Sequence, residues 1–499
     1  MGVIKRQGFK STVISYIGVL IGAVAMLRIY PLDMEVYGYA QWLISMVTLM
    51  FPLATFGILT LLIKYFPSYQ KADSSNYSGL LTLLLSGLVV TYSLFLVFWF
   101  FFKQHFIALL NWAKIPNTDI IEENEVYLLI LLGLFILLRF SVNHSLNGLR
   151  IVVPNIVEKL GFKIYLPLLV LAYVYIKFPI EIFVYGLLGF FLLAALLLLI
   201  YLKYLGILKF GKIRQPENSD SYSEMTKYSL FSSLNHLGTT LTVRMDSIMI
   251  PLFLSMASNG FYNIALFVSN VLDFPARSLT QIAAPIIANA WEEEDLGEID
   301  MIYKKAATNL LLIGGLTFIL IWFVLDDLAY LSTDTESFMK VRSIFLILGV
   351  AKLVDMLTSV NSHILIYSSS YKLNLVFLLA LGVINVYLNF LWIPVHGVAG
   401  AAMATAFSML IYNVLKTGFL YFKYDLQPFS FSQIKILVLM GLFIGLYLII
   451  PDSSSANFNL IFKSILVGGG YLYLAYLWKV SEDANEMGLN ILRRLRLIK

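Results

Sequence analysis

Six basic residues lie inside or at the edges of long apolar segments, and they are the first candidates for chemistry in this sequence. A charged side chain at bilayer depth costs at least about 2.5–3.5 kcal/mol on insertion scales, so each of them needs a reason to be there. An arginine presents a bidentate fork that fits phosphate oxygens. The set therefore favours binding of an oxyanion over cleavage of a bond. Its members are Arg28, Arg139, Arg244, Arg277, Lys352 and Lys463.

Two of these arginines belong to polar stripes with helical spacing. Arg139, Asn143 and Asn147 recur at every fourth residue, so one helix face would carry a guanidinium and two amides, with His144 one step round. Such a face cannot contact lipid. The second stripe contains Ser229, Ser233, His236, Thr240, Arg244 and Ser247. We expect its hydroxyls to hydrogen-bond neighbouring helices and Arg244 to face a cavity.

Arg277 follows Asp273 by four residues, in the order that favours a salt bridge within one helix. Pro275 between them removes a backbone donor and predicts a kink near Val271. Two interpretations remain open, a self-neutralised pair at a kink and a hinge that presents Arg277 to an anion. Two interpretations are also open for Arg28, which lies about one turn before Pro31. Its side chain either extends to the outer membrane interface or faces the interior of the protein.

Carboxylates in the apolar segments are candidates for coupling to an ion. Lys352 and Asp355 share a helix face, so an internal pair competes there with ligand binding. Asp355 with nearby His363 is a plausible proton or sodium site. Asp246 is a further candidate, since it lies about 200° round the helix from Arg244 and cannot pair with it on the same face. We expect no catalytic residue, metal or cofactor.

The elements that hold these residues follow from composition. Of the 499 residues, 59% are hydrophobic and 13% charged, with a mean hydropathy of +0.82, where a soluble domain is roughly a quarter charged. This is the composition of an integral membrane protein. The net charge of +5 is spread thinly, which argues against nucleic acid as a partner. The absence of cysteine excludes disulfides, zinc–thiolate sites and thiol nucleophiles.

A bilayer core of about 30 Å needs about 20 apolar residues in a helix. This length predicts an all-α polytopic protein with about fourteen transmembrane helices and an uncleaved first span. Counted over the connecting segments, Lys and Arg number 24 on the side of the N-terminus and 5 on the other, which places both termini in the cytoplasm. The spans are 12–30, 39–63, 79–102, 126–149, 156–175, 178–201, 227–253, 260–287, 303–325, 341–366, 372–392, 397–420, 434–450 and 458–478.

An internal repeat organises these spans. Gly38 and Gly260 open the second and eighth spans in similar contexts, the glycines of 186–189 recur at 397–400, and the stripe on Arg139 has a counterpart in Asp355, Ser359 and His363, at offsets of 211–222 residues. We predict two pseudo-symmetric six-helix bundles around a central cavity, which is the geometry of alternating access. The lobes are 1–205 and 227–425, with a cytoplasmic linker (206–226), two further helices (426–480) and an amphipathic cytoplasmic tail (481–499).

Three stretches resemble one family. They are 27–57, 246–285 and, most specifically, 385–405, which reads N-x3-N-x3-IP-x2-G-x2-GAAxAT. The chain is similar to the polysaccharide-transport family of bacterial oligosaccharide-lipid flippases of O-antigen and capsule pathways. Their superfamily also holds multidrug-and-toxin exporters and lipid II flippases. Relatives carry functional arginines in the first and eighth spans, which map onto Arg28 and Arg277.

The resemblance implies translocation of an undecaprenyl-pyrophosphate-linked oligosaccharide across the bacterial cytoplasmic membrane, for surface polysaccharide or lipopolysaccharide synthesis. A monomer is expected, with a polysaccharide polymerase and glycosyltransferases as possible partners. One alternative is a multidrug or cation exporter of the same architecture. Another is an enzyme, a membrane glycosyltransferase or polymerase, whose only candidate acids would be Asp326, Asp327 and those of 119–125 on outer loops.

Overall fold

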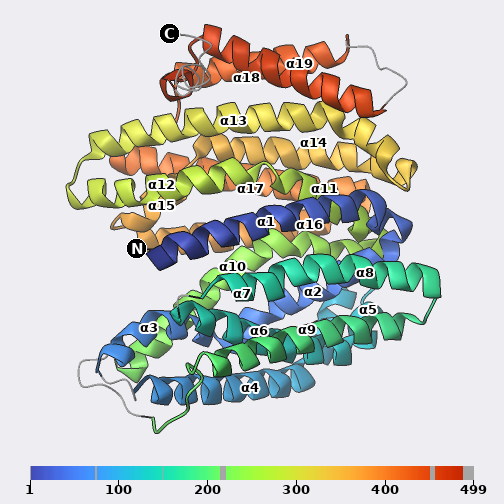
Figure 1. Ribbon diagram of the computed structural model, residues 1–499, viewed down its shortest axis with the longest axis vertical. Coiled ribbons are helices and arrows are strands. Elements are labelled where there is room, and N and C mark those ends of the chain that lie inside the picture. Colours follow the sequence, from blue (N-terminus) through green and yellow to red (C-terminus); the bar gives the residue numbers. More distant parts are fainter. Residues whose placement is uncertain (1, 73–75, 149, 214–220, 450–455, 487–499) are drawn as a thin grey trace. The chain divides into compact units, whose positions relative to one another are not determined.

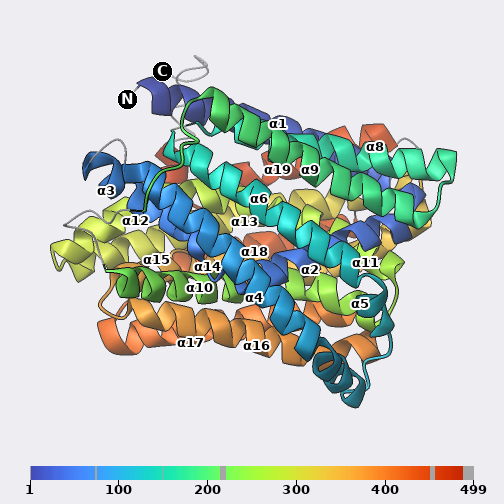
Figure 2. The same ribbon diagram turned by 90° about the horizontal axis from the view of Figure 1, so that it is seen from below.

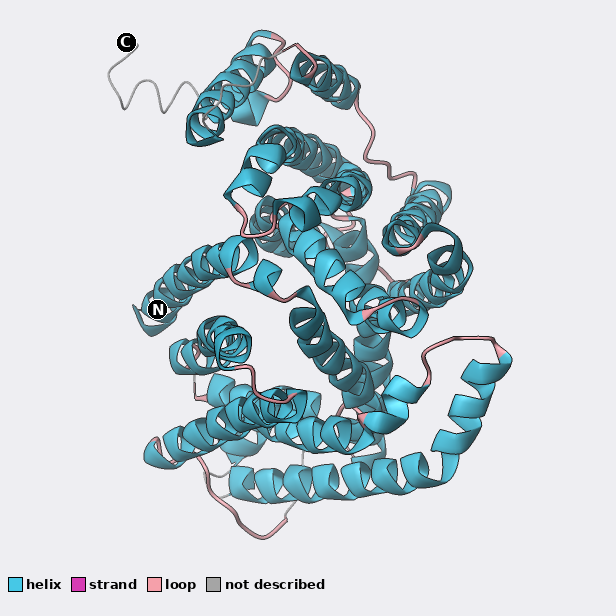
Figure 3. Ribbon diagram, turned by 90° about the vertical axis from the view of Figure 1, so that its right-hand side faces the viewer, coloured by secondary structure: helices cyan, strands magenta, loops and turns pink. Residues whose placement is uncertain are grey.

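The computed structural model describes residues 2–72, 76–148, 150–213, 221–449 and 456–486. Within these ranges the secondary structure is helical and no strand is present (Figure 3). The predicted all-α membrane architecture is therefore confirmed. Part of the predicted linker (214–220) and most of the amphipathic tail (487–499) lie outside the described residues.

The chain divides into two compact units, residues 1–260 and 261–499. In the first, α6 and α9 lie side by side, and α10 packs on α2 (Figures 1 and 2). A 3-10 turn follows α1, and a π-helical segment (Asn155–Leu160) precedes α8. Its helices are α1 (Gly2–Arg28), α2 (Met34–Thr55), α3 (Ile58–Ala72), α4 (Asn76–Trp112), α5 (Asp119–Glu123), α6 (Glu125–Asn147), α7 (Val152–Pro154), α8 (Gly161–Ile176), α9 (Ile180–Tyr204), α10 (Tyr222–Phe253) and the start of α11 (Met256–Asn270).

In the second unit α16 and α17 pack on each other, α14 packs on both α13 and α17, and α18 and α19, red in Figure 1, pack on α13. The lobe boundaries derived from the repeat remain a prediction. The observed units divide the chain differently, because α10 belongs to the first unit and α18 and α19 belong to the second. The remaining helices are α12 (Asp273–Glu292), α13 (Leu296–Leu331), α14 (Thr335–Thr358), α15 (Asn361–Tyr367), α16 (Tyr371–His396), α17 (Val398–Tyr424), α18 (Phe431–Tyr447) and α19 (Ala456–Leu477).

Each of the fourteen predicted spans coincides with a helix or a pair of helices, but the count of fourteen is not confirmed. Ten helices of the described chain are long and apolar enough to cross a membrane, and a bent pair, α14 with α15, makes an eleventh. The other three predicted spans are α10, the α11–α12 pair and the short α18. Helix α10 is too polar because it carries the hydroxyl, histidine and arginine stripe, and α11–α12 is interrupted.

Three predicted spans are broken where one continuous helix was expected. The chain between α2 and α3 has positive φ at Phe56 (47°) and Gly57 (73°). Helix α11 ends at Asn270 and α12 begins at Asp273, so the interruption lies at the kink predicted from Pro275. Between α14 and α15 the axis bends by 46°, with positive φ at Ser359 (48°). The bend separates Asp355 from His363, so the continuous face predicted for them is wrong.

The two glycines of the repeat touch each other's helices. A Cβ on Gly38 would lie 1.8 Å from the Met256 carbonyl oxygen, and one on Gly260 would lie 2.4 Å from the Met34 carbonyl oxygen. Asn259 closes the contact by donating from Nδ2 to the Gly38 carbonyl oxygen at 2.8 Å. Small residues let membrane helices approach this closely and gain dispersion contacts. The repeated glycines therefore hold the start of α2 against the start of α11.

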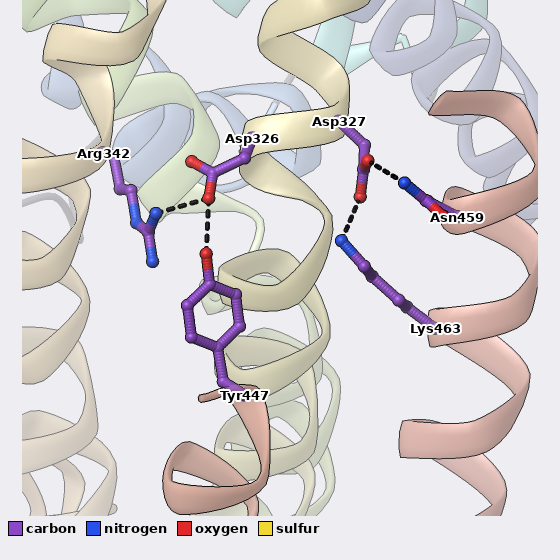
Figure 4. A network of polar contacts seen from close by, with 6 residues as sticks. All are labelled: Asp326, Asp327, Arg342, Tyr447, Asn459 and Lys463. Atoms are coloured by element: carbon purple, nitrogen blue, oxygen red, sulfur yellow. Dashed lines mark hydrogen bonds and ion pairs between the residues drawn. The ribbon is translucent and has the colours of Figure 1, made fainter. Parts of the chain in front are cut away.

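Helix α19 is tied to one end of α13 by an ion pair, and α18 is tied to it by a tyrosine hydrogen bond (Figure 4). Asp327 accepts hydrogen bonds from Lys463 Nζ (2.7 Å) and Asn459 Nδ2 (3.0 Å), and both charged side chains are only 4% exposed. Asp326 pairs with Arg342 and accepts a hydrogen bond from Tyr447 Oη at 2.5 Å.

Asp326 and Asp327 are therefore not loop acids available to an enzyme, as the sequence alone suggested. Both lie inside α13, where each carboxylate neutralises a cation from another helix. The polar side chains that anchor α18 and α19 come from segments more than 100 residues away in the chain. The two helices after the repeat thus form part of the second unit.

Replacing Gly38 or Gly260 by Ala is expected to lower the free energy of unfolding by about 1–3 kcal/mol, because the added methyl meets backbone that cannot move aside. Gly189→Ala is the matched control, since a Cβ there meets nothing within 4 Å. Thermal unfolding of the detergent-purified variants measures the difference. Equal midpoints for Gly38→Ala and Gly189→Ala would show that the close approach is absent.

Lys463→Met is expected to destabilise the protein by about 3–5 kcal/mol, because it leaves the buried Asp327 carboxylate uncompensated. Lys304→Ala removes the more exposed Lys304–Asp300 pair and is expected to cost about 1 kcal/mol or less. Chemical unfolding in detergent compares the two. A Lys463→Met variant no less stable than Lys304→Ala would contradict the buried tie.

Candidate functional site

A cavity of about 250 Å³ lies between α2, α3, α6 and α10 in the first unit. Arg139 and Asn143 from α6 reach it, and so do His236 and Thr240 from α10. The described residues that line it include no carboxylate. The remaining lining residues are Thr48, Phe51, Pro52, Thr55, Gly57, Leu59, Thr60 and Phe135. The cavity thus combines one permanent cation, an imidazole and several neutral hydrogen-bonding groups.

Arg139 is positioned by two contacts. Its guanidinium lies 5.0 Å from the centroid of the Phe135 ring, one turn earlier on α6, which is a cation–π geometry. Its Nη1 lies 2.8 Å from Oε1 of Glu158 on the π-helical segment. The side chain remains 39% exposed, so the guanidinium is held in place and still accessible from the cavity.

Arg244, on α10, is partly buried and lies within electrostatic range of both Arg139 and the Tyr37 hydroxyl. Two guanidinium groups this close repel each other, and an anion between or beside them would relieve that repulsion. His236 also lies within electrostatic range of Arg139. The two polar stripes predicted on separate helices therefore face one region of the first unit.

The hydroxyls of the α10 stripe have the structural role that was expected of them. Ser229 Oγ donates to the Phe56 carbonyl oxygen at 2.5 Å, and Ser233 Oγ donates to the Pro52 carbonyl oxygen at 2.7 Å. These carbonyl groups lie at the end of α2, where the helix stops at Thr55 and Phe56 turns left-handed, so they lack the usual helical donors. The bonds fix α10 against α2 and so set the cavity wall.

Two members of the α6 stripe serve the fold. Asn147 Nδ2 donates to the Leu62 carbonyl oxygen at 3.1 Å, which ties α6 to α3. His144 is fully buried, and its Nε2 lies 3.0 Å from the Ile207 carbonyl oxygen, so Nε2 carries the proton. Of the four residues in this stripe, only Arg139 and Asn143 reach the cavity.

In the second unit Lys352 and Asp273 form an ion pair, with Nζ 2.8 Å from Oδ2. The pair joins α14 to the first residue of α12, just after the break in the α11–α12 span. Neither sequence-based pairing is present, because Asp273 does not bind Arg277 and Lys352 does not bind Asp355. Arg277 is exposed and has no ion pair among the described residues. The ion pair therefore forms between two helices, whereas the spacing predicted pairs within one helix.

Asp355 belongs to a chain of hydrogen bonds that links α14, α15 and α17. Its Oδ1 accepts from Asn413 Nδ2 at 3.1 Å, and Asn413 Oδ1 accepts from Thr358 (2.9 Å) and Asn361 (3.1 Å). Ser362 donates to Asn361 Oδ1 at 3.3 Å and accepts from Lys416 Nζ. These amides and hydroxyls surround the 46° bend.

Lys416 at the end of this chain is fully buried, and it also donates to the Tyr412 hydroxyl at 3.1 Å. Lys416 lies within α17, inside a predicted span, and was not among the candidates taken from the sequence. Glu158 and Asn413 were not among them either. The partners of all three come from distant segments, and the one usable signal was a lysine inside an apolar stretch.

The remaining candidates lie outside both groups. Arg28 is the last residue of α1 and is exposed, while Asp246 is buried in α10. His363, on α15, lies within electrostatic range of Lys416 and 6.4 Å from the Tyr367 ring. The roles of these residues in substrate or ion binding, and of Pro275 as a hinge, stay predictions. No group of three or more His, Asp or Glu in the described chain could hold a metal ion.

No protein-family model matches the chain, but a curated protein is distantly similar to it. Over 238 residues it is 24% identical to a Haloferax volcanii protein described as "Probable low-salt glycan biosynthesis flippase Agl15". The match covers 46% of this chain and 48% of the relative, so the chain spans about half the length of that relative.

Two solved structures cover nearly the whole chain. A lipid II flippase MurJ in an inward closed conformation superposes with a TM-score of 0.69 at 14% identity, over 94% of this chain and 98% of that one. The chain has the fold of the MOP superfamily transporters. An inward-facing multidrug resistance MATE transporter of the MOP superfamily gives a TM-score of 0.56 at 12% identity, over 86% and 95%. The superfamily resemblance drawn from the sequence is confirmed for the fold, and these relatives are transporters by name.

The Lys352–Asp273 pair makes a prediction for this MOP-type fold. Lys352→Ala is expected to lower the free energy of unfolding by about 1 kcal/mol or more, because it leaves the partly buried Asp273 carboxylate unpaired. Arg277→Ala is expected to leave stability unchanged, since Arg277 is exposed and forms no ion pair. Thermal unfolding of the two purified variants provides the comparison. The reverse ranking would restore the local Asp273–Arg277 pair.

Proposed function

We propose that the protein is a flippase that moves an undecaprenyl-pyrophosphate-linked oligosaccharide across the cytoplasmic membrane by alternating access. The observation that carries this proposal is the carboxylate-free cavity of the first unit, which is lined by Arg139; Arg244 lies outside the lining but within electrostatic range of Arg139. A diphosphate carries several negative charges close together, and two guanidinium groups match both that charge and its oxygen geometry.

The neutral groups around the arginines fit the rest of such a substrate. Asn143 and Thr240 offer amide and hydroxyl hydrogen bonds of the kind that a sugar hydroxyl accepts or donates, while Phe51 and Phe135 supply apolar area. The cavity is large enough for a diphosphate and too small for a whole glycan. We infer that it recognises the group that is common to all lipid-linked donors, while the sugars lie outside it.

Comparisons support a lipid-linked glycan as the cargo class. The solved structure with the higher TM-score is named a lipid II flippase, and the curated relative is named a glycan biosynthesis flippase. The finer assignments belong to the proposal. They are an O-antigen, capsule or exopolysaccharide precursor as cargo, the bacterial cytoplasmic membrane as location with both termini inside, and a polymerase and glycosyltransferases as neighbours in the pathway.

A multidrug or cation exporter is the second candidate, because the MATE structure shares the fold. A cation would need carboxylates at its site, and none lines the cavity of the first unit among the described residues. Asp355 in the second unit is exposed and tied to Asn413, which is the feature that favours this alternative. The sign of the charge on the cavity lining therefore distinguishes a flippase for an anionic lipid from a cation exporter.

Arg244→Ala and Arg139→Ala are expected to reduce surface display of the glycan at least tenfold, because each removes a cation that would hold the diphosphate. The measurement is complementation of a deletion strain, with surface glycan quantified by labelling and the transporter quantified in isolated membranes. Arg150→Ala is the matched control, since Arg150 is exposed and lies outside the cavity lining.

Normal glycan display in both the Arg139→Ala and the Arg244→Ala variant, with normal protein levels, would overturn the assignment of the site. Sensitivity of the deletion strain to cationic dyes, with unchanged surface glycan, would instead favour the exporter.

A further inference from the structure

In the part of the chain that the structure describes, Glu158 is the one carboxylate that pairs with Arg139, and it does not line the cavity itself. It lies on the π-helical segment Asn155–Leu160, a conformation that is rare and often found at functional sites. Its Oε1 accepts from Arg139 at 2.8 Å. Its other oxygen, Oε2, is buried and has no hydrogen-bond partner in the described structure. The carboxylate is thus only half satisfied.

A half-satisfied buried carboxylate is a poor structural anchor. Leaving a charged acceptor without a partner costs free energy that a fully bonded pair would recover. The Lys463–Asp327 pair shows the satisfied arrangement in the same protein, because there one carboxylate oxygen binds the lysine and the other binds Asn459. The Arg139–Glu158 contact therefore holds less firmly than a structural ion pair.

The backbone around Glu158 is fixed, so any release must come from the side chain. Asn155 Nδ2 donates to Ser11 Oγ on α1 at 2.7 Å, and the Val152 backbone N–H donates to the Gln7 side chain at 3.3 Å. These bonds attach the segment to α1. The glutamate side chain has three rotatable bonds and can turn away from Arg139 without moving the helix.

We propose that Glu158 is a built-in counterion of Arg139, which the diphosphate of the substrate displaces and which weaker anions cannot displace. The idea rests on the proposed function and adds a determinant of specificity to it. A membrane contains a large excess of phospholipids with a single negative charge. Exchanging one carboxylate for one such phosphodiester gains nothing, whereas a diphosphate brings more charge, which the electrostatic field of Arg244 also favours.

Removing the carboxylate charge is therefore expected to strengthen binding of both anions and to weaken discrimination between them. In the experiment the full-length protein is purified in detergent, and its affinity for geranylgeranyl diphosphate and geranylgeranyl monophosphate is measured by thermophoresis. Wild type is expected to prefer the diphosphate. Glu158→Gln is expected to bind both probes more tightly and to lose about tenfold of the preference. Glu158→Asp is expected to retain most of the preference.

Two sets of variants separate this role from a structural one. Glu125→Gln is the matched control, because Glu125 forms a comparable pair with Lys103 on α4 and lies outside the cavity lining. It is expected to leave both affinities unchanged. Arg139→Gln and the double variant Arg139→Gln/Glu158→Gln are expected to behave alike, since Glu158 acts only through Arg139. Thermal midpoints identify any variant that merely misfolds.

The outcomes distinguish this inference from the function on which it rests. If wild type binds the diphosphate and Arg139→Gln weakens it, but folded Glu158→Gln keeps the wild-type preference or binds more weakly, the counterion role is overturned and the flippase proposal stands. If wild type binds neither probe, both are overturned.

Discussion

An ion inside a hydrocarbon layer has no water to solvate it, so each charge in this protein must be matched by protein groups or left to bind something else. The Lys463–Asp327 pair is the complete case, with both carboxylate oxygens bonded and both side chains almost fully buried. The Lys352–Asp273 ion pair is also matched but is more exposed. Arg139 differs, because its acidic partner among the described residues is half satisfied and its guanidinium remains accessible.

This difference links folding to function. Ion pairs between helices help to hold the second unit together, and one of them anchors α19. The charges of these residues therefore stabilise the fold. The cation that lines the first unit's cavity, Arg139, has only a half-satisfied partner. A cavity with one accessible guanidinium and no carboxylate in its described lining favours an anion, which is why we propose an anionic cargo.

Backbone breaks give the fold its polar sites. The end of α2 at Phe56 leaves free the carbonyl groups that Ser229 and Ser233 of α10 bind, and Asn361, Ser362 and Lys416 gather at the bend between α14 and α15. In a membrane protein, irregular backbone is tolerated where side chains or a cavity satisfy its hydrogen bonds. These places therefore coincide with the polar stripes, and the close approach of Gly38 and Gly260 brings two of the interrupted segments together.

The sequence by itself determined the class of the protein, the approximate positions of its helices and four of the residues that line the cavity, because hydrophobic length and helical periodicity are local properties. Arg139, Asn143, His236 and Thr240 were all identified from spacing alone. Only the tertiary structure decided the partners of the charges. Asp273 binds Lys352 instead of Arg277, Arg139 binds Glu158, and Lys416 lies buried within a helix. A partner of opposite charge is chosen by proximity in three dimensions, and spacing along one helix carries no information about which distant helix will lie beside it.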